Sequence, residues 1–260
     1  MPQHPHMNKK TDTHSTVRYE APALEKGLDI LELLSGTSDS MYLSQISQAV
    51  GRSRSEIYRV LQVLERRGYL ERSADDHYTM TNHLFRLVMK RPTTSGLLEA
   101  ALPMMHKLSD EIQQSCHLVV PSDQFMVVIA TVESPYELGM VVRIGHRRPL
   151  LEATSGLVIV AYQPDAVRER WIEKYSPQHR PQARSAVRQA VAAIRTRGYA
   201  AIPSSVVPGV TDISAPVMRG SAAAAALAVP YMKLAGIRVS QDEVAAQLLA
   251  TTEHISRELR

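Results

Sequence analysis

The feature that most constrains the fold is the stretch GRSRSEIYRVLQVLERRG at residues 51–68, which specifies both ends of one helix. Ser53 and Glu56 have the S-x-x-E spacing of a capping box, in which each side chain binds the other residue's backbone amide. Gly68 suits the left-handed residue that follows a helix. The apolar residues at helical spacing are Ile57, Leu61 and Leu64. The pattern therefore predicts a helix from Ser53 to just before Gly68.

Further short elements are predicted on either side of this helix. In PALEKGLDILELL, the leucines predicted to face inward are Leu24, Leu28 and Leu31. In LSQISQAVG, Ser44 is predicted to cap a short helix that ends at Gly51. The residues that this helix is predicted to bury are Ile46, Ala49 and Val50. The stretch YLERSADDHYTMT then predicts two short strands around a turn at Asp75 and Asp76.

The charge of residues 51–72 leaves two interpretations open. These residues hold six arginines against three glutamates. Taken alone, that surplus favours a solvated helix face laced by Glu–Arg pairs. The order of elements favours the other interpretation, because a short helix, a glycine, a capped basic helix and a hairpin describe a winged helix-turn-helix. We therefore expect this unit to bind double-stranded operator DNA.

The buried face predicted for the basic helix identifies the side chains left for DNA. Arginine can contact guanine through two hydrogen bonds, and serine can reach base edges or phosphates. Arg66 and Arg67, further along the helix, suit phosphate contact better than base reading. The full set of predicted DNA contacts is Ser44, Ser53, Arg54, Ser55, Tyr58, Arg59, Arg66 and Arg67.

The remaining sequence predicts a larger second domain. Residues 1–20 read as a flexible tail, 21–81 as the winged helix-turn-helix, 82–94 as a linker helix and 95–260 as an α/β domain with antiparallel strands, so the fold class is α+β. Its predicted strands include CHLVV, FMVVIATV, LGMVVRIG, TDISAPV and AAALAVPY. Ser240 and Glu243 repeat the capping-box spacing at the start of a last helix.

Composition narrows the class of protein. The 260 residues are 44% hydrophobic and 22% charged, and no apolar run is long enough to cross a membrane. A polar N-terminus and a lone cysteine, Cys116, predict a cytoplasmic protein. No metal or cofactor is predicted, because nothing fixes the geometry of the tail histidines His4, His6 and His14. Cys116 and His117 are adjacent and would point to opposite faces of a strand, which disfavours a nucleophile and base pair.

The motifs resemble one known family. ALEKGLDILELL, LSQISQAVGRSRSEIYRVLQVLERRGYL and YTMTNHLFRL resemble the N-terminal region of IclR-type bacterial transcriptional regulators. VVRIGHRRPLLEATSGLVIVAY, IRTRGYA and PGVTDISAPV resemble their second domain, so the resemblance covers residues 21–259. It implies a regulator that binds DNA as a dimer or tetramer, with a GAF-like α/β domain for a small organic effector.

The resemblance also implies where an effector binds. It points to the loop and helix start containing Gly145, Pro149 and Thr154, where free backbone amides attract an anion or a carbonyl oxygen. An equally weighted alternative is that Gly156 only lets the turn pack and Thr154 only caps a helix. The predicted effector contacts are Met140, Arg143, Thr154, Ser155, Gly156, Asp212 and Ala228.

Some positions depart from the family pattern and bear on the ligand. The chain has Ile202 to Ser205, Asp212 and Ala228 to Tyr231 where members that bind small oxoacids have acidic, neutral and serine-rich stretches respectively. A carboxylate at Asp212 would repel an anion and favour a hydroxyl or ammonium donor. We expect a larger neutral or hydroxylated compound, such as an aromatic catabolite or a sugar-derived metabolite. The charged stretch Arg143, His146, Arg147 and Arg148 is interpreted as solvent-facing, with Arg143 as the exception because it lies in a predicted strand.

Two other classes of function compete with a regulator. An enzyme is disfavoured because the chain has no G-x-S-x-G, P-loop, G-x-G-x-x-G or HExxH motif. A winged helix can also bind protein, in which case its binding would depend little on salt. The expected mechanism is allosteric, with an effector that favours one dimer geometry over another.

Overall fold

The computed structural model describes residues 21–37, 39–90, 92–176, 181–234, 236 and 239–259. The predicted tail at residues 1–20, with its three histidines, lies outside them. The chain forms two compact units, Met1–Lys90 and Arg91–Arg260. The boundary between them falls inside the stretch predicted as a linker, while the finer division at residues 81 and 94 stays a prediction.

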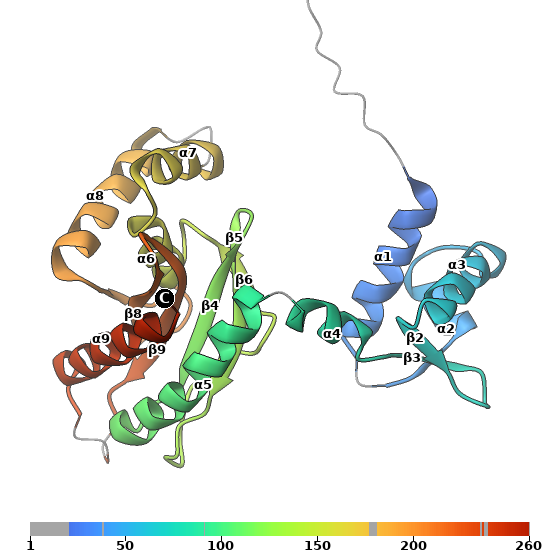
Figure 1. Cartoon of the computed structure of the whole chain (residues 1–260), viewed down its shortest axis with the longest axis horizontal. Helices are drawn as coiled ribbons and strands as arrows, with labels where there is room; N and C mark the ends of the chain where they lie inside the picture. The colour runs from blue at the N-terminus through green and yellow to red at the C-terminus, as the bar shows by residue number, and fades with distance from the viewer. Residues whose placement is uncertain are drawn as a thin grey trace, which may run out of the picture. The chain divides into compact units, whose positions relative to one another are not determined.

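The first unit packs helices against a small antiparallel sheet with the strand order β1-β3-β2 (Figure 1). Its elements are α1 (Pro22–Ser35), β1 (Met41–Tyr42), α2 (Leu43–Ala49), α3 (Arg54–Arg66), β2 (Leu70–Arg72), β3 (His77–Met80) and α4 (His83–Met89). The core contains Ile30, Leu34, Ile46, Ile57, Leu61, Leu64, Leu70 and Tyr78. Asp76, with φ of 63°, turns the chain between β2 and β3. This arrangement confirms the predicted winged helix-turn-helix.

The inward face predicted for α1 is wrong. Gly27, Ile30 and Leu34 are buried, whereas Leu24 is 63% and Leu28 48% exposed. The helix is apolar on more than one side, so spacing alone cannot choose the buried stripe. The choice is made by packing against α3, where a Cβ on Gly27 would lie 3.6 Å from Val60. The predicted Leu31 is half-buried at the border of this core.

The predicted start of α2 is also wrong. Tyr42, not Ser44, is the N-cap residue, and its backbone amide donates to Gln45 Oε1 at 2.8 Å. The helix begins earlier because strand β1 runs directly into it. Ala49 is exposed, and its predicted buried place is taken by Ser47, whose hydroxyl donates to the carbonyl of Arg52 at 2.6 Å.

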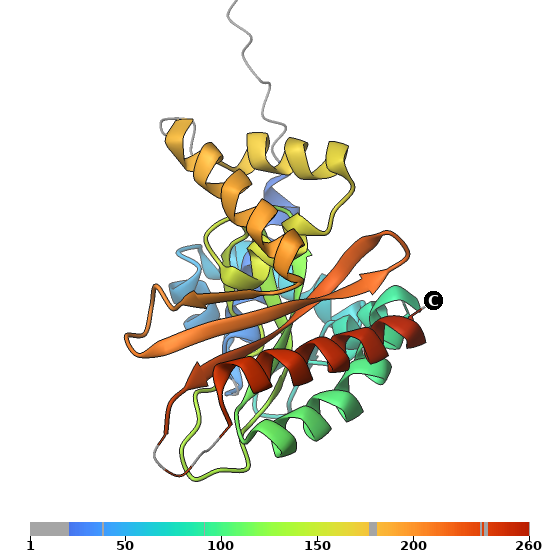
Figure 2. The same cartoon turned by 90° about the vertical axis from the view of Figure 1, so that its left-hand side faces the viewer.

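The second unit is built on an antiparallel sheet of six strands in the described residues, in the order β6-β5-β4-β9-β8-β7. The strands are β4 (Cys116–Ser122), β5 (Phe125–Val132), β6 (Arg147–Pro149), β7 (Ala200–Pro203), β8 (Val210–Arg219) and β9 (Ala222–Met232). Helices α5 (Pro92–Ile112) and α9 (Gln241–Glu258) lie side by side on one face (Figure 2). The other face carries α6 (Thr154–Ala161), α7 (Asp165–Tyr175) and α8 (Pro181–Arg197). The predicted α+β class is thereby confirmed.

Strand alternation sends neighbouring residues into two separate cores. Cys116 and Leu118 of β4 face α5 and α9, whereas Val119 faces the α6 side. The pairing with β5 shifts after Leu118, so Val119 lies opposite Val128, which faces the same side. In β9, Leu227 joins the first core and Ala226 the second. The sheet is therefore covered on both faces and leaves one concave area on the α6 side for a site.

One predicted strand is absent from the described residues. The stretch LGMVVRIG runs as a loop, and only Arg147–Pro149 forms the short edge strand β6. Arg143 consequently does not lie in a strand, as the sequence had predicted. The apolar side chains that suggested a strand instead face solvent or a cavity: Ile144 is 67% exposed, and Val142 lines a cavity on the α6 side.

Candidate functional site

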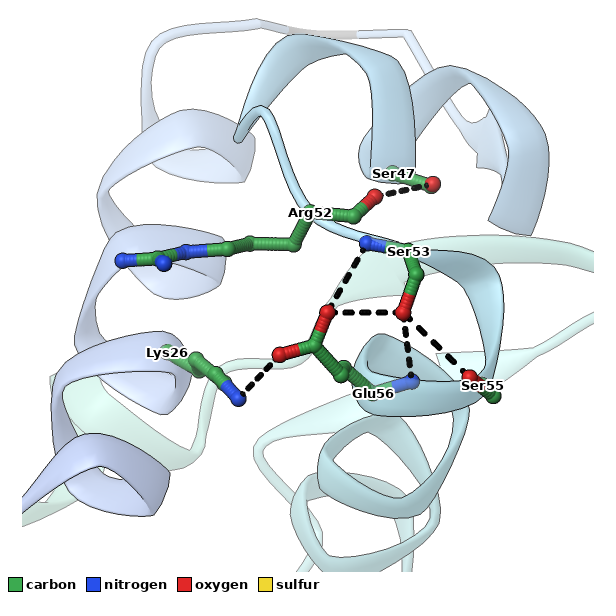
Figure 3. A network of polar contacts seen from close by, with 6 residues as sticks. All are labelled: Lys26, Ser47, Arg52, Ser53, Ser55 and Glu56. Carbon is green, nitrogen blue, oxygen red and sulfur yellow. Dashed lines mark hydrogen bonds and ion pairs between the residues drawn. The ribbon is translucent and has the colours of Figure 1, made fainter.

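A network of polar contacts fixes the start of α3 (Figure 3). The backbone amide of Ser53 donates to Glu56 Oε2 at 3.1 Å, and the Ser53 hydroxyl donates to the same oxygen at 2.7 Å. The amide of Glu56 in turn donates to Ser53 Oγ at 3.4 Å, which completes the predicted capping box. Lys26 of α1 pairs with Glu56 Oε1 at 2.7 Å. Hydrogen bonds from Lys26 and then Ser53 lower the pKa of Glu56 to about 2.

Both ends of α3 and its buried face agree with the sequence. Ile57, Leu61 and Leu64 are buried, and Gly68, with φ of 76°, ends the helix. The predicted DNA-facing residues on and beside α3 are all exposed: Ser53, Arg54, Ser55, Tyr58, Arg59, Arg66 and Arg67. Ser44 is half-buried on α2. The buried stripe therefore leaves these polar side chains on the exposed side of α3, with Val63 as an exposed apolar neighbour.

The cations of α3 do not pair with its glutamates. Within the described part of the first unit, the ion pairs are Lys26–Glu56 and Arg72–Asp76, and neither involves Arg54 or Arg59. The Glu–Arg lacing that a merely solvated face predicts is thus not found there. These guanidinium groups can instead meet an anionic partner without breaking an ion pair.

A second candidate site is a cavity of about 290 Å³ on the α6 side of the larger sheet. Its floor includes His117 of β4, Ala228 of β9 and Asp212 of β8. The start of α6 and the loop before β6 form its walls. Of the predicted effector contacts, those that line it are Met140, Arg143, Thr154, Ser155, Asp212 and Ala228. The structure therefore brings together residues that are up to 88 positions apart in the chain, from Met140 to Ala228.

Gly156 is absent from this lining and has a packing role. A Cβ at this position would lie 2.0 Å from the carbonyl oxygen of Leu150. Only glycine lets α6 approach the preceding turn so closely. Thr154, by contrast, does not cap the helix, because Ala153 is the N-cap residue and makes no side-chain cap. One half of the packing alternative thus holds for Gly156, and the other half is wrong for Thr154.

The charged loop before β6 borders the cavity and is also open to solvent. Arg143, His146 and Arg148 line the cavity, while Arg147 lies over the ring of Phe125 with 5.0 Å to its centroid. His146 and Arg147 are exposed, in agreement with a solvent-facing stretch, and so is Arg143, its stated exception. Arg148 is half-buried, so that interpretation is wrong for Arg148. The curl of the sheet accounts for the difference, because it brings the β6 edge across the concave face: Arg148 Nη2 donates to Ser205 Oγ, beyond β7, at 3.0 Å.

Two titratable groups on the cavity floor, Asp212 and His117, have shifted pKa values. Burial raises the pKa of Asp212, against the opposing effects of a hydrogen bond from Ser204 and the charge of Arg148. Burial, followed by the nearby His146, lowers the pKa of His117 to about 4. His117 is therefore neutral at pH 7. Sequence reasoning had considered it only beside Cys116, and nothing local indicated that its side chain faces a cavity.

Cys116 lies on the opposite face from His117, as predicted. Its thiol is fully buried against α5, where Sγ lies 3.5 Å from the carbonyl oxygen of Met105. Burial raises its pKa to about 12, so the thiol stays protonated and is a poor nucleophile. In the described ranges, no group of three or more His, Cys, Asp or Glu residues is placed to hold a metal ion. No helix of those ranges is both long and apolar enough to cross a membrane.

Family comparisons match both units. Residues 91–257 match the bacterial transcriptional regulator IclR C-terminal domain, and residues 23–74 match the IclR helix-turn-helix domain. The chain is 27% identical over 259 residues to the HTH-type transcriptional regulator KdgR of Escherichia coli, which covers 97% of this chain and 95% of KdgR. It is 28% identical over 213 residues to the probable transcriptional regulator SauR of Cupriavidus necator, over 80% of this chain and 84% of SauR.

Solved structures share the whole architecture. Pseudomonas aeruginosa HmgR is 28% identical, with a TM-score of 0.69 over 91% of this chain and 98% of that one. An IclR homolog from Microbacterium hydrocarbonoxydans, complexed with 4-hydroxybenzoate, is 22% identical with a TM-score of 0.75 over 92% and 99%. Both domain matches, in the order in which the two units occur, show that this chain belongs to the IclR family of bacterial transcriptional regulators.

Proposed function

We propose that this protein binds operator DNA through α3 and that a small molecule in the second unit controls that binding. Arg54 and Arg59, near the start of α3, would reach base edges in the major groove. Arg66 and Arg67 would contact phosphates. The observation that carries this assignment is the exposed arginine face of α3, whose cations are not paired with its glutamates.

Self-association is part of the proposal. On the first unit, α1 exposes Leu24 and Leu28, and α4 exposes Phe85 at 62% and Val88 at 48%. Exposed apolar side chains of this size on two helices favour burial against a second copy. A dimer, or a tetramer made of two dimers, would present two copies of α3 to two half-sites of an operator.

The proposed effector site is the cavity over Asp212, His117 and Ala228. Its volume suits one small organic molecule, and its side chains mix apolar walls with a few polar groups, as ligand pockets do. An effector that prefers one dimer geometry would shift the population toward it and so change DNA affinity. We propose no catalytic step or cofactor for this cavity, and operator binding would place the action of the protein in the cytoplasm.

The decisive experiment is a mobility-shift titration of the full chain with DNA from upstream of its own gene. Replacing both arginines, Arg54→Ala with Arg59→Ala, should weaken specific binding about a hundredfold, because each bidentate base contact is worth roughly 1–3 kcal/mol. A matched control removes two exposed charges from the second unit, Arg170→Ala with Arg197→Ala, and should bind normally. Equal binding by the first variant and the wild type would refute the assignment of α3.

Salt dependence separates this function from a winged helix that binds protein. Phosphate contacts release counterions, so the logarithm of affinity should fall linearly with the logarithm of salt concentration. The Arg66→Ala variant should reduce that slope by about one while leaving sequence preference unchanged. Binding that is insensitive to salt would favour the protein-interaction alternative.

A further inference from the structure

His117 is a buried polar side chain that faces the cavity. Only 8% of the residue is exposed, and its neighbours on β4, Cys116 and Leu118, point to the opposite face. Among the residues that the structure describes, no hydrogen bond engages its ring. A neutral imidazole offers one donor and one acceptor, and a buried group of this kind needs a partner. Because the residue lines the cavity, a molecule bound there can supply that partner.

The cavity has a second polar group at a distance. Ala228 is the register partner of both His117 and Ser214, and Asp212 lies two residues from Ser214 on the same face of β8. With strands about 4.8 Å apart and a rise of about 3.3 Å per residue, the Cα atoms of His117 and Asp212 are on the order of 12 Å apart. The β9 side chains that line the cavity beside these two groups are Ala228, paired with His117, and Pro230, paired with Asp212. A ligand that hydrogen-bonds to both His117 and Asp212 must therefore carry its two polar groups at opposite ends, not on neighbouring carbons.

The two ends differ in charge. Arg143 and His146 come from one tight turn, in which the amide of His146 donates to the carbonyl of Arg143 at 3.1 Å, and His146 lies close enough to lower the pKa of His117. The guanidinium of Arg143 makes this end of the cavity electropositive, and the neutral ring of His117 adds a hydrogen-bond donor. At the other end, Asp212 has Ser204 beside it and offers an acceptor of hydrogen bonds. The charge of Arg148 also acts on Asp212, and the same guanidinium donates to Ser205. The ends thus match a ligand with a carboxylate at one end and a hydroxyl at the other.

Much of the cavity lining is apolar. Met126, Met140 and Val142 line it together with the polar groups, and so does Ala153, which precedes the start of α6. Extra hydroxyl groups against these side chains would lose their hydrogen bonds to water without replacing them. A second carboxylate would lie against Asp212, where like charges repel. A polyhydroxylated acid and a dicarboxylic acid should therefore both fit the cavity worse than a ligand built on a flat, apolar ring.

We infer that the effector is a hydroxylated aromatic monocarboxylate, with its carboxylate at His117, His146 and Arg143 and its hydroxyl at Asp212. This inference rests on the proposed effector role of the cavity and makes His117 a specificity-determining residue. It sharpens the expectation of a neutral or hydroxylated compound, because Asp212 excludes an anionic group at its own end only. The smallest oxoacids remain excluded, since they cannot reach both ends.

Isothermal titration calorimetry of the full-length protein with four probes tests the ligand class. The probes are 4-hydroxybenzoate, 4-hydroxybenzamide, benzoate and D-gluconate. We expect 4-hydroxybenzoate to bind tightest. The amide lacks the negative charge and benzoate lacks the hydroxyl, so both should bind roughly tenfold to a hundredfold more weakly. Tightest binding by the amide or by gluconate would overturn the inference, and so would no binding by any probe.

Variants test the two ends separately. His117→Leu should lower affinity for 4-hydroxybenzoate roughly tenfold or more and for the amide by less, because a carboxylate is the stronger acceptor. His117→Gln, which keeps a donor, should recover part of the loss. Asp212→Ala should reduce 4-hydroxybenzoate to the affinity of benzoate. His106→Leu, at an exposed histidine on α5, is the matched control. Circular dichroism of each variant confirms that it folds.

The outcomes separate this inference from the proposed function. If His117→Leu binds all probes as the wild type does, His117 is not the anchor, and the inference fails while a different effector of the same cavity remains possible. If the wild type fails to bind its own upstream DNA in the mobility shift, the proposed function fails by itself. Correct probe selectivity together with DNA binding that each probe leaves unchanged would uphold the ligand class and refute effector control.

Discussion

The starts of α3 and α6 differ in whether a side chain caps their first backbone amides. The first amide groups of any helix lack partners within that helix. In α3, Ser53 and Glu56 satisfy them through a capping box, and the helix start is exposed. In α6, Ala153 offers no side-chain cap, and the buried Thr154 and Ser155 begin the helix beside the cavity. The cap of α3 therefore leaves neighbouring side chains free for a partner, whereas the residues that begin α6 line the cavity themselves.

This comparison teaches which sites can be altered without loss of the fold. At α3 the cap is separate from the arginines, so recognition and folding can be changed independently. At α6 the cavity-lining residues Thr154 and Ser155 begin the helix themselves, and Gly156 allows the close approach to the turn that places them. Three substitutions probe this difference, in decreasing order of expected effect.

The largest effect is expected for Gly156→Ala. The added Cβ would lie 2.0 Å from the carbonyl oxygen of Leu150, a backbone atom that cannot move without distorting the turn. Overpacking of this kind costs about 3 kcal/mol. We expect the free energy of unfolding of the second unit, measured by urea denaturation, to fall by about that amount. Ligand binding in the cavity should be lost as well.

Gly96→Ala on α5 is the matched control. No atom lies within 4 Å of a Cβ built at Gly96, and alanine favours helix over glycine by about 1 kcal/mol. This variant should therefore be slightly more stable than the wild type. If Gly156→Ala were as stable as Gly96→Ala, the close approach of α6 to the turn at Leu150 would not be required for the fold.

The next effect concerns pH and the cavity floor. The pKa of His117 is about 4 in the folded chain and about 6.5 in an unfolded one, so between these values the unfolded state binds more protons. Stability contributed by neutral His117 is thus present near pH 7 and is lost as pH falls. From pH 7 to pH 5, the expected loss is about 2 kcal/mol.

Urea unfolding of wild type and His117→Leu at both pH values measures this loss. The carboxylates titrate in both proteins, so the difference between them isolates the histidine. His106→Leu removes an exposed histidine and should keep the full pH dependence of the wild type. An identical pH dependence in His117→Leu and the wild type would contradict the burial of a neutral imidazole.

The same contrast explains how far the sequence could predict the structure. The start, end and buried face of α3 follow from Ser53, Glu56 and Gly68, because each of these interactions joins residues only a few positions apart. The inward face of α1 was wrong because packing against α3 decides it, and spacing within α1 carries no information about α3.

The cavity illustrates the same limit more strongly. Asp212 and Thr154 were predicted through family resemblance, since no local pattern relates them. His117 and Arg148 were missed as cavity residues because their positions depend on strand register and on the curl that brings Arg148 to Ser205. The strand predicted at LGMVVRIG failed because its apolar residues serve a cavity wall and not a sheet face.

The smallest expected effect compares two identical caps. Ser53 of α3 and Ser240 of α9 both form capping boxes, with Glu56 and Glu243 respectively. Loss of an N-cap serine costs about 1 kcal/mol, so Ser53→Ala and Ser240→Ala should destabilise their own units by similar amounts. Only Ser53→Ala should also weaken operator binding, because it removes a predicted DNA contact and because fraying of the first turn would displace Arg54. If both variants weakened operator binding equally, the effect would come from general stability, and the start of α3 would have no special part in recognition.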